Sequence, residues 1–185
     1  AGGIEAVVRV MGEHQANAVV MEQACWALGN VAANNAANQA GIAAAGGIEA
    51  VVRVLGGHLA DAEVMRPACC ALRILSCNNA DNQASITAAG SIEALVRVLG
   101  EHHADAAVMK DVCRVLSNLA VLADNQARIA AAGGIEAVVR VLGKLLANPA
   151  VIHLACWALR NLAVLAANKA GIAAAGGIEA VVRVL

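Results

Sequence analysis

The segment GIEAVVRV occupies Gly3–Val10 and returns unchanged at three later places in the chain. The further copies lie at Gly47–Val54, Gly134–Val141 and Gly177–Val184, and a variant, SIEALVRV, lies at Ser91–Val98. The isoleucines of these segments follow one another at steps of 44, 44, 43 and 43 residues. A fixed period of this length indicates a repeat array, in which each unit buries its apolar face against its neighbours.

Two further blocks keep the same spacing, so each full repeat contains three elements. One reads ACWAL at 24–28, ACCAL at 68–72, VCRVL at 112–116 and ACWAL at 155–159. The other reads NQAGIAAAG at 38–46, NQASITAAG at 82–90, NQARIAAAG at 125–133 and NKAGIAAAG at 168–176. Apolar residues recur at helical spacing in all three elements, and no segment alternates as a strand does.

In the first copies we expect helices over 18–33, 38–45 and 48–55, with a turn over 12–17. Gly46 and Gly47 would end the short Ala-rich helix that precedes them. Glu49 stands four residues before Arg53, which predicts an ion pair on the helix surface. The other copies of the segment repeat this spacing.

Composition excludes several classes of function. The chain of 185 residues is 60% hydrophobic, has a formal charge of −1, and contains two aromatic side chains, Trp26 and Trp157. Near-neutral charge gives no reason to expect nucleic acid or an anionic membrane as partner. No apolar run approaches the ~18–20 residues that span a bilayer, and no secretory signal is visible, so we expect a soluble protein.

The cysteines and histidines recur with the repeat, which argues against disulfides and metal sites. Cys25, Cys69, Cys113 and Cys156 are equivalent, and stacking would separate them by ~10 Å, too far for a disulfide. We expect buried thiols and, weakly, a reducing cytoplasmic location, with the nucleus left open. His14, His58 and His102 also recur, too far apart to share a metal. Since no catalytic constellation converges, we expect no enzyme activity, no metal and no cofactor.

These blocks resemble the armadillo repeat over the whole chain. The resemblance lies in the three-helix length, the Asn-Gln opening of the first helix, and the Trp-Ala-Leu-x-Asn pattern at 26–30 and 157–161. Two features depart from the family: Glu5 and its equivalents stand where a proline is usual, and the repeats are one or two residues longer than is typical of the family. HEAT repeats are the nearest rival. The resemblance implies an all-α fold, a right-handed α-solenoid built as an armadillo-like superhelix of three-helix repeats. We expect one array over 1–185, with repeats at 1–37 (partial), 38–81, 82–124, 125–167 and 168–185 (partial).

In the proteins that this chain resembles, third helices line a groove in which an Asn row binds the backbone of an extended peptide and Trp residues form slots between repeats. The equivalent rows here are Glu22, Trp26, Asn30; Arg66, Cys70, Ile74; Lys110, Arg114, Asn118; and His153, Trp157, Asn161. With the neighbouring arginines, the candidate peptide-binding residues are Trp26, Asn30, Arg66, Arg73, Lys110, Arg114, Asn118, Trp157, Arg160 and Asn161. Ile74 interrupts the Asn row, which predicts weaker, bipartite binding.

The charges and the tryptophans of this candidate groove can each be interpreted in two ways. Its cations outnumber Glu22, so an acidic partner is favoured over a basic one. The simpler alternatives are that the charges are only solvated and that the tryptophans only pack between helices.

A second class of function follows from the two ends of the sequence. Residues 1–10, AGGIEAVVRV, are identical to residues 175–184, so both ends carry the same apolar helix. The alternative function is therefore a structural or designed repeat scaffold without a physiological ligand, which self-associates into a dimer or an end-to-end oligomer. Excision from a longer array, engineering and natural drift all remain open as origins.

Overall fold

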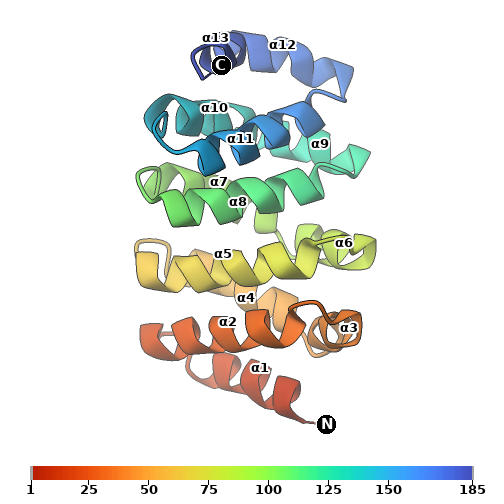
Figure 1. The fold of residues 1–185 in the computed structure, drawn as a ribbon. Coiled ribbons are helices and arrows are strands. Elements are labelled where there is room, and N and C mark those ends of the chain that lie inside the picture. The colour runs from red at the N-terminus through yellow and green to blue at the C-terminus, as the bar shows by residue number, and fades with distance from the viewer. Residues whose placement is uncertain (1, 185) are drawn as a thin grey trace. The chain divides into compact units, whose positions relative to one another are not determined.

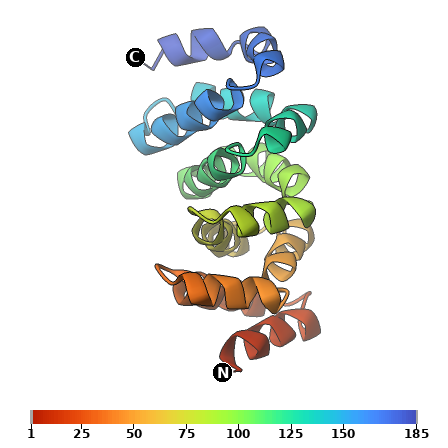
Figure 2. The same ribbon diagram turned by 90° about the vertical axis from the view of Figure 1, so that its right-hand side faces the viewer.

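The computed structural model describes residues 2–184, and these form thirteen α-helices without any strand (Figures 1 and 2). The first helices are α1 (Gly3–Glu13), α2 (Ala18–Ala32), α3 (Ala36–Ala44), α4 (Gly47–Gly57), α5 (Ala62–Ser76), α6 (Ala80–Ala88) and α7 (Ser91–Glu101). The later helices are α8 (Ala106–Leu119), α9 (Ala123–Ala131), α10 (Gly134–Lys144), α11 (Pro149–Leu162), α12 (Ala166–Ala174) and α13 (Gly177–Val182). The outermost positions of the predicted array, Ala1 and Leu185, lie outside the described range.

Contacts divide the chain into a first unit that ends at Ala94 and a second unit that begins at Leu95, within α7. In each unit two long helices lie side by side: α2 and α5 in the first, α8 and α11 in the second (Figure 1). These are the third helices of the predicted three-helix repeats, and the all-helical prediction is confirmed. The predicted repeat boundaries stay predictions.

The core of the first unit is thin because small residues bring its third helices together. Cys25, Leu28 and Leu72 are fully buried between the layers. A Cβ on Gly29 would lie 3.6 Å from the Ala71 backbone, so the two helices meet at small side chains. Close-packed Ala, Val and Leu layers need no large aromatic residues for bulk, which explains their scarcity.

Gly46, Gly133 and Gly176 end the short first helices in the left-handed conformation, with φ of 77–80°. The next residue already begins a helix, so Gly47 is part of α4 rather than a second stop. A Cβ on Gly47 would lie 2.6 Å from Cγ2 of Ile42, which explains glycine there. Ser91 occupies the equivalent position at the start of α7, and its buried hydroxyl has no hydrogen-bond partner within residues 2–184.

The Asn-Gln pair near the start of α3, α6 and α9, and Asn168 in α12, cap the third helix that precedes each of them. Asn82 donates to the carbonyl oxygen of Leu75 at 3.0 Å, and Gln83 donates to that of Ser76 at 2.9 Å. Asn38, Asn125 and Asn168 form the equivalent bonds to Val31, Leu119 and Leu162. The side-chain amides thus satisfy the last carbonyls of a helix, which have no partner within the helix itself.

Two local predictions were wrong. Helix α1 runs through Gly12 to Glu13, and the turn begins only at His14. The pairing of Glu49 with Arg53 is not formed within the described residues. Oε2 of Glu49 instead lies 3.9 Å from the point that a Cβ on Gly46 would occupy, at the start of its own helix. There the carboxylate faces the positive end of the helix dipole, which competes with the exposed arginine.

All six cysteines are thiols, and none forms a disulfide within the described residues. Cys25, Cys69 and Cys113 are buried, Cys70 and Cys156 are half-buried, and Cys77 is exposed. Burial raises the pKa of the Cys25 thiol, and that of Cys113, to about 12. These thiols are therefore apolar packing groups in the folded chain.

His58 links two repeats, a role that the turn prediction missed. Its Nε2 lies 2.7 Å from the carbonyl oxygen of Gln15. Within residues 2–184, no cluster of three or more His, Cys, Asp or Glu side chains is placed to hold a metal ion. In the same range no individual helix has the length and apolarity to cross a membrane, although the bent pair α3 and α4 passes on length and composition alone.

Candidate functional site

In the first unit, Trp26 and Asn30 stand one helical turn apart on α2. Trp26 is 39% exposed, and Asn30 is exposed. The amide of Asn30 forms no side-chain hydrogen bond within the described residues, so its donor and acceptor are both available. On the neighbouring α5, Ile74 is half-buried, where the row predicted from the repeat would have placed another amide.

The predicted cations of the first unit have local partners. Nη1 of Arg66 lies 3.3 Å from Oε1 of Glu63 on the same helix. Nη2 of Arg73 lies 3.2 Å from Sγ of Cys70. The positive charge of Arg66 is therefore partly compensated within α5.

In the second unit, two arginines converge on the indole ring of Trp157. Cζ of Arg114, on α8, lies 4.2 Å from the ring centroid, and Cζ of Arg160, on α11, lies 5.6 Å from it. We call Arg114, Trp157 and Arg160 the Arg–Trp–Arg cluster. The His153 ring meets the same indole edge-on, with centroids 5.7 Å apart. Guanidinium groups at these distances are attracted to the negative face of the ring.

An open pocket of about 430 Å³ lies beside this cluster. Its lining includes His153, Cys156, Trp157 and Arg160 from α11. Lys110, one helical turn before Arg114 on α8, is exposed. Within the described residues neither Arg114 nor Arg160 forms an ion pair, so the cluster is cationic without an acidic partner.

Asn161 has a partner that sequence reasoning missed. Its Nδ2 donates to the carbonyl oxygen of Ser117 at 2.9 Å and to the Ser117 hydroxyl at 3.1 Å. Ser117 immediately precedes Asn118 in the predicted row, and Gly29 stands in the equivalent place before Asn30. Ile74 reaches toward Gly29 just as Asn161 reaches Ser117, with its Cδ1 3.7 Å from the Cβ position there. In both units, the position immediately before the Asn row of one third helix holds a small residue, Gly29 or Ser117. This small residue is therefore the sequence signal that a side chain of the next third helix contacts that position.

The candidate residues form two groups, one in each unit. Trp26, Asn30, Arg66 and Arg73 belong to the first, and Lys110, Arg114, Asn118, Trp157, Arg160 and Asn161 belong to the second. The alternative that tryptophan packs between third helices applies in part to Trp157, whose ring stacks with Arg114 across two helices. Trp26 has no such ring contact among the described residues. Their roles in binding stay predictions.

Comparison with known proteins finds likeness in structure. No protein-family model and no curated protein matches the chain. An engineered protein of known crystal structure is 30% identical, with 96% of this chain and 69% of that chain covered and a TM-score of 0.83. Computationally designed armadillo repeat proteins for modular peptide recognition are 23% identical, with 97% and 73% covered and a TM-score of 0.85. A designed armadillo repeat protein in complex with the peptide (KR)4 is 22% identical, with 97% and 72% covered and a TM-score of 0.81.

Proposed function

We propose that this chain, which has the fold of an armadillo-repeat solenoid, is a non-enzymatic scaffold that binds an extended peptide on the third helices of its two units. The paired helices α2 and α5, and α8 and α11, expose amide, indole and cationic side chains together. An extended peptide has unpaired backbone donors and acceptors, and an asparagine side chain can serve either kind. We assign no metal, cofactor, nucleic acid or membrane to this function.

The Arg–Trp–Arg cluster is the observation on which the choice of ligand rests. Arg114 and Arg160 approach one indole ring without an ion pair among the described residues. A peptide with acidic side chains would compensate this charge, whereas a basic peptide would be repelled. We therefore propose a ligand opposite in charge to the (KR)4 peptide that accompanies one of the similar structures.

The two units would contribute unequally to peptide binding. In the first, Asn30 has an amide without a side-chain partner in the described range, and Trp26 offers exposed apolar surface beside it. In the second, Nδ2 of Asn161 already donates to two oxygens of Ser117, so the cationic cluster would supply most of the affinity. We propose a backbone-reading site on α2 and an acid-binding site on α8 and α11. A net hydrogen bond to the peptide backbone is worth only about 0.5–1.5 kcal/mol, so several such contacts are needed for useful affinity.

A peptide-library screen tests this proposal. The chain would be compared with an Asn30→Ala/Trp26→Ala variant and with an Arg114→Gln/Arg160→Gln variant. Arg140→Gln is the matched control, because Arg140 is an exposed arginine on α10 of the same unit. We expect the parent and the control to select extended acidic peptides, the first variant to bind them more weakly, and the arginine variant to lose the acidic preference. Equal selection by all four proteins would refute the proposal.

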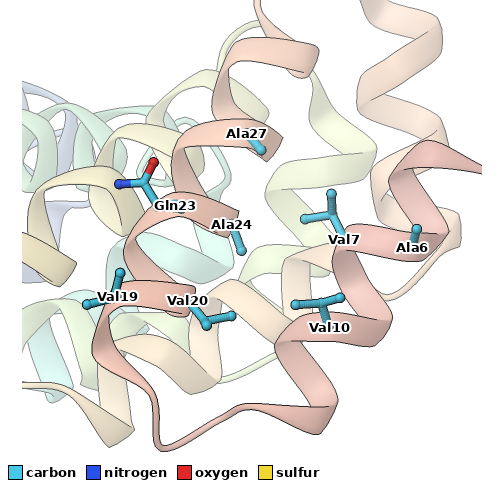
Figure 3. Close-up of a pocket in the computed structure, with 8 residues that line it drawn as sticks. All are labelled: Ala6, Val7, Val10, Val19, Val20, Gln23, Ala24 and Ala27. Carbon is cyan, nitrogen blue, oxygen red and sulfur yellow. The ribbon is translucent and has the colours of Figure 1, made fainter.

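The alternative function, a self-associating scaffold, is favoured by a specific observation. Ile178 and Val182 on α13 are 60% and 65% exposed, whereas the equivalent Ile48, Ile92 and Ile135 are buried. Figure 3 shows the apolar pocket of about 440 Å³ between α1 and α2, where Val7 and Val10 face Val20 and Ala24.

Contacts inside the chain support the proposal that a second copy covers these surfaces. Cγ2 of Val8 lies 3.3 Å from the Cβ position of Gly47, whereas nothing lies within 4 Å of that of Gly3. Val182 is the equivalent of Val8, so Val182 of one copy would pack on Gly3 of another. Val182→Asp would then abolish association in sedimentation equilibrium, while Val121→Asp, at a position 66% exposed elsewhere, would not. A concentration-independent monomer mass for the parent would exclude this function.

A further inference from the structure

The Arg–Trp–Arg cluster holds more positive charge than one carboxylate compensates. Arg114 and Arg160 both lie within 5.6 Å of the same ring centroid. The acceptor closest at hand is neutral: Nη2 of Arg160 lies 3.5 Å from Oδ1 of Asn161. Lys110 adds an exposed ammonium group one turn from Arg114. A bound carboxylate would leave at least one of these cations unpaired.

A phosphate monoester suits this arrangement better than a carboxylate. It has a charge of about −1.5 to −2 at neutral pH and three strong acceptor oxygens. Guanidinium groups pair with phosphate through two parallel N–H donors, a geometry that lysine does not offer. Two arginines on one anion therefore match both the charge and the number of acceptors.

The cluster is also organised before any ligand arrives. Arg114 is half-buried and stacks on Trp157, so its side chain has already lost much of the freedom that binding would otherwise remove. The pocket of about 430 Å³ that Trp157 and Arg160 line is open and has room for a phosphate group beside the ring.

We infer that the Arg–Trp–Arg cluster is the binding site for a phosphorylated serine or threonine side chain of the peptide ligand. This inference rests on the proposed peptide-binding function and names the chemical class of the side chain that anchors the peptide. His153 lines the pocket, and Lys110, one turn before Arg114 on α8, would add longer-range attraction.

Nuclear magnetic resonance of the indole N–H groups gives a direct test. The chain has two tryptophans, hence two indole signals, and a Trp26→Phe variant assigns them. The probes are N-acetyl-phosphoserine amide, N-acetyl-glutamate amide, N-acetyl-serine amide and inorganic phosphate. We expect the Trp157 signal to shift saturably with the phosphoserine probe, several-fold less tightly with the glutamate probe or inorganic phosphate, and not with serine. The Trp26 signal, from the other unit, is the internal control.

Arginine variants test whether the phosphoserine probe binds at the Arg–Trp–Arg cluster. Arg114→Gln and Arg160→Gln should each weaken the phosphoserine probe about tenfold or more, because each removes charge-assisted hydrogen bonds. Arg140→Gln should leave its affinity unchanged. A glutamate probe or inorganic phosphate that binds as tightly as the phosphoserine probe, a Trp157 signal that does not move, or arginine variants that bind like the parent would each overturn the inference.

The probes have no extended backbone, so this test separates the inference from the proposed function. If library peptides bind but the phosphoserine probe leaves Trp157 unmoved, the inference fails and the peptide-binding function stands. If the probe binds at the cluster but no extended peptide binds, the proposed function fails.

Discussion

Replacing Ser91 by alanine should stabilise the protein, because Ser91 buries a hydroxyl group that has no hydrogen-bond partner among the residues that the structure describes. The residue begins α7 and is fully buried. Glycine stands in the equivalent place at Gly47, Gly134 and Gly177. The other repeats therefore place no polar atom at this junction.

The magnitude follows from the cost of an unsatisfied hydroxyl. Burial of such a group without a partner costs about 1–3 kcal/mol, and Ser91→Ala removes the group while keeping the Cβ. We expect the free energy of unfolding to rise by about 1–2 kcal/mol. Ser91→Gly also removes the Cβ, which at Gly134 would lie 2.5 Å from Cγ2 of Ile129. Glycine gives the unfolded chain greater conformational entropy, which offsets the stability gained from removing the Cβ by about 0.5–1 kcal/mol.

Urea denaturation followed by circular dichroism measures the effect as a higher midpoint at unchanged slope. Thr87→Val is the matched variant, since Thr87 buries the second hydroxyl without a partner and valine keeps its shape. Gly134→Ala tests the steric part with the opposite sign and should lower the midpoint. If Ser91→Ala leaves the midpoint unchanged or lowers it, the hydroxyl is not unsatisfied in the folded protein and the reasoning is wrong.

Three further predictions concern other parts of the chain. Asn168→Ala should lower the free energy of unfolding by about 1–3 kcal/mol, because its Nδ2 donates to two carbonyl oxygens, those of Leu162 and Gln126; urea denaturation checks this. Burial raises the pKa of the Cys25 and Cys113 thiols from 9.0 to about 12, so these thiols ionise at lower pH in the unfolded chain than in the folded one. The free energy of unfolding should therefore fall as the pH rises above 9.0. A Cys25→Ala/Cys113→Ala variant should show a smaller fall when urea denaturation is repeated across this pH range. Arg114→Ala should shift Trp157 emission to longer wavelength in a Trp26→Phe background and cost about 0.5–1 kcal/mol, whereas an unchanged spectrum would mean that the stacking does not persist in solution.

The repeat and its helices are predictable because their signals are periodic and local. The isoleucines at 4, 48, 92, 135 and 178 set the period, and the glycines near each helix junction mark its end. That Glu49 and Arg53 do not form the ion pair that their spacing predicted could not be foreseen from the spacing alone. Spacing shows that two side chains can meet, but the helix N-terminus offered the carboxylate a competing position.

The candidate site was predictable as a set of helix positions but not as a set of available groups. Trp157 and Asn161 follow from the repeat, yet their surroundings depend on side chains of the preceding third helix. Arg114 stacks on the ring of Trp157. The amide of Asn161 donates a hydrogen bond to Ser117, which lies 44 residues earlier in the sequence. A pattern within one repeat contains no information on such contacts, because they depend on which variant residues are neighbours in the stack.

Because the Asn-Gln pair caps the helix of the preceding repeat, a structural module ends at a different residue from the sequence repeat. Asn125 and Gln126 open one repeat, but they close the last carbonyls of the helix before it, those of Leu119 and Ala120. A module cut before Asn125 would leave those carbonyls bare, and a module cut after Gln126 would keep them closed. When these repeats are recombined into longer or shorter arrays, the segments should therefore be joined after the Asn-Gln pair. Each third helix then keeps the side chains that cap its last carbonyl groups.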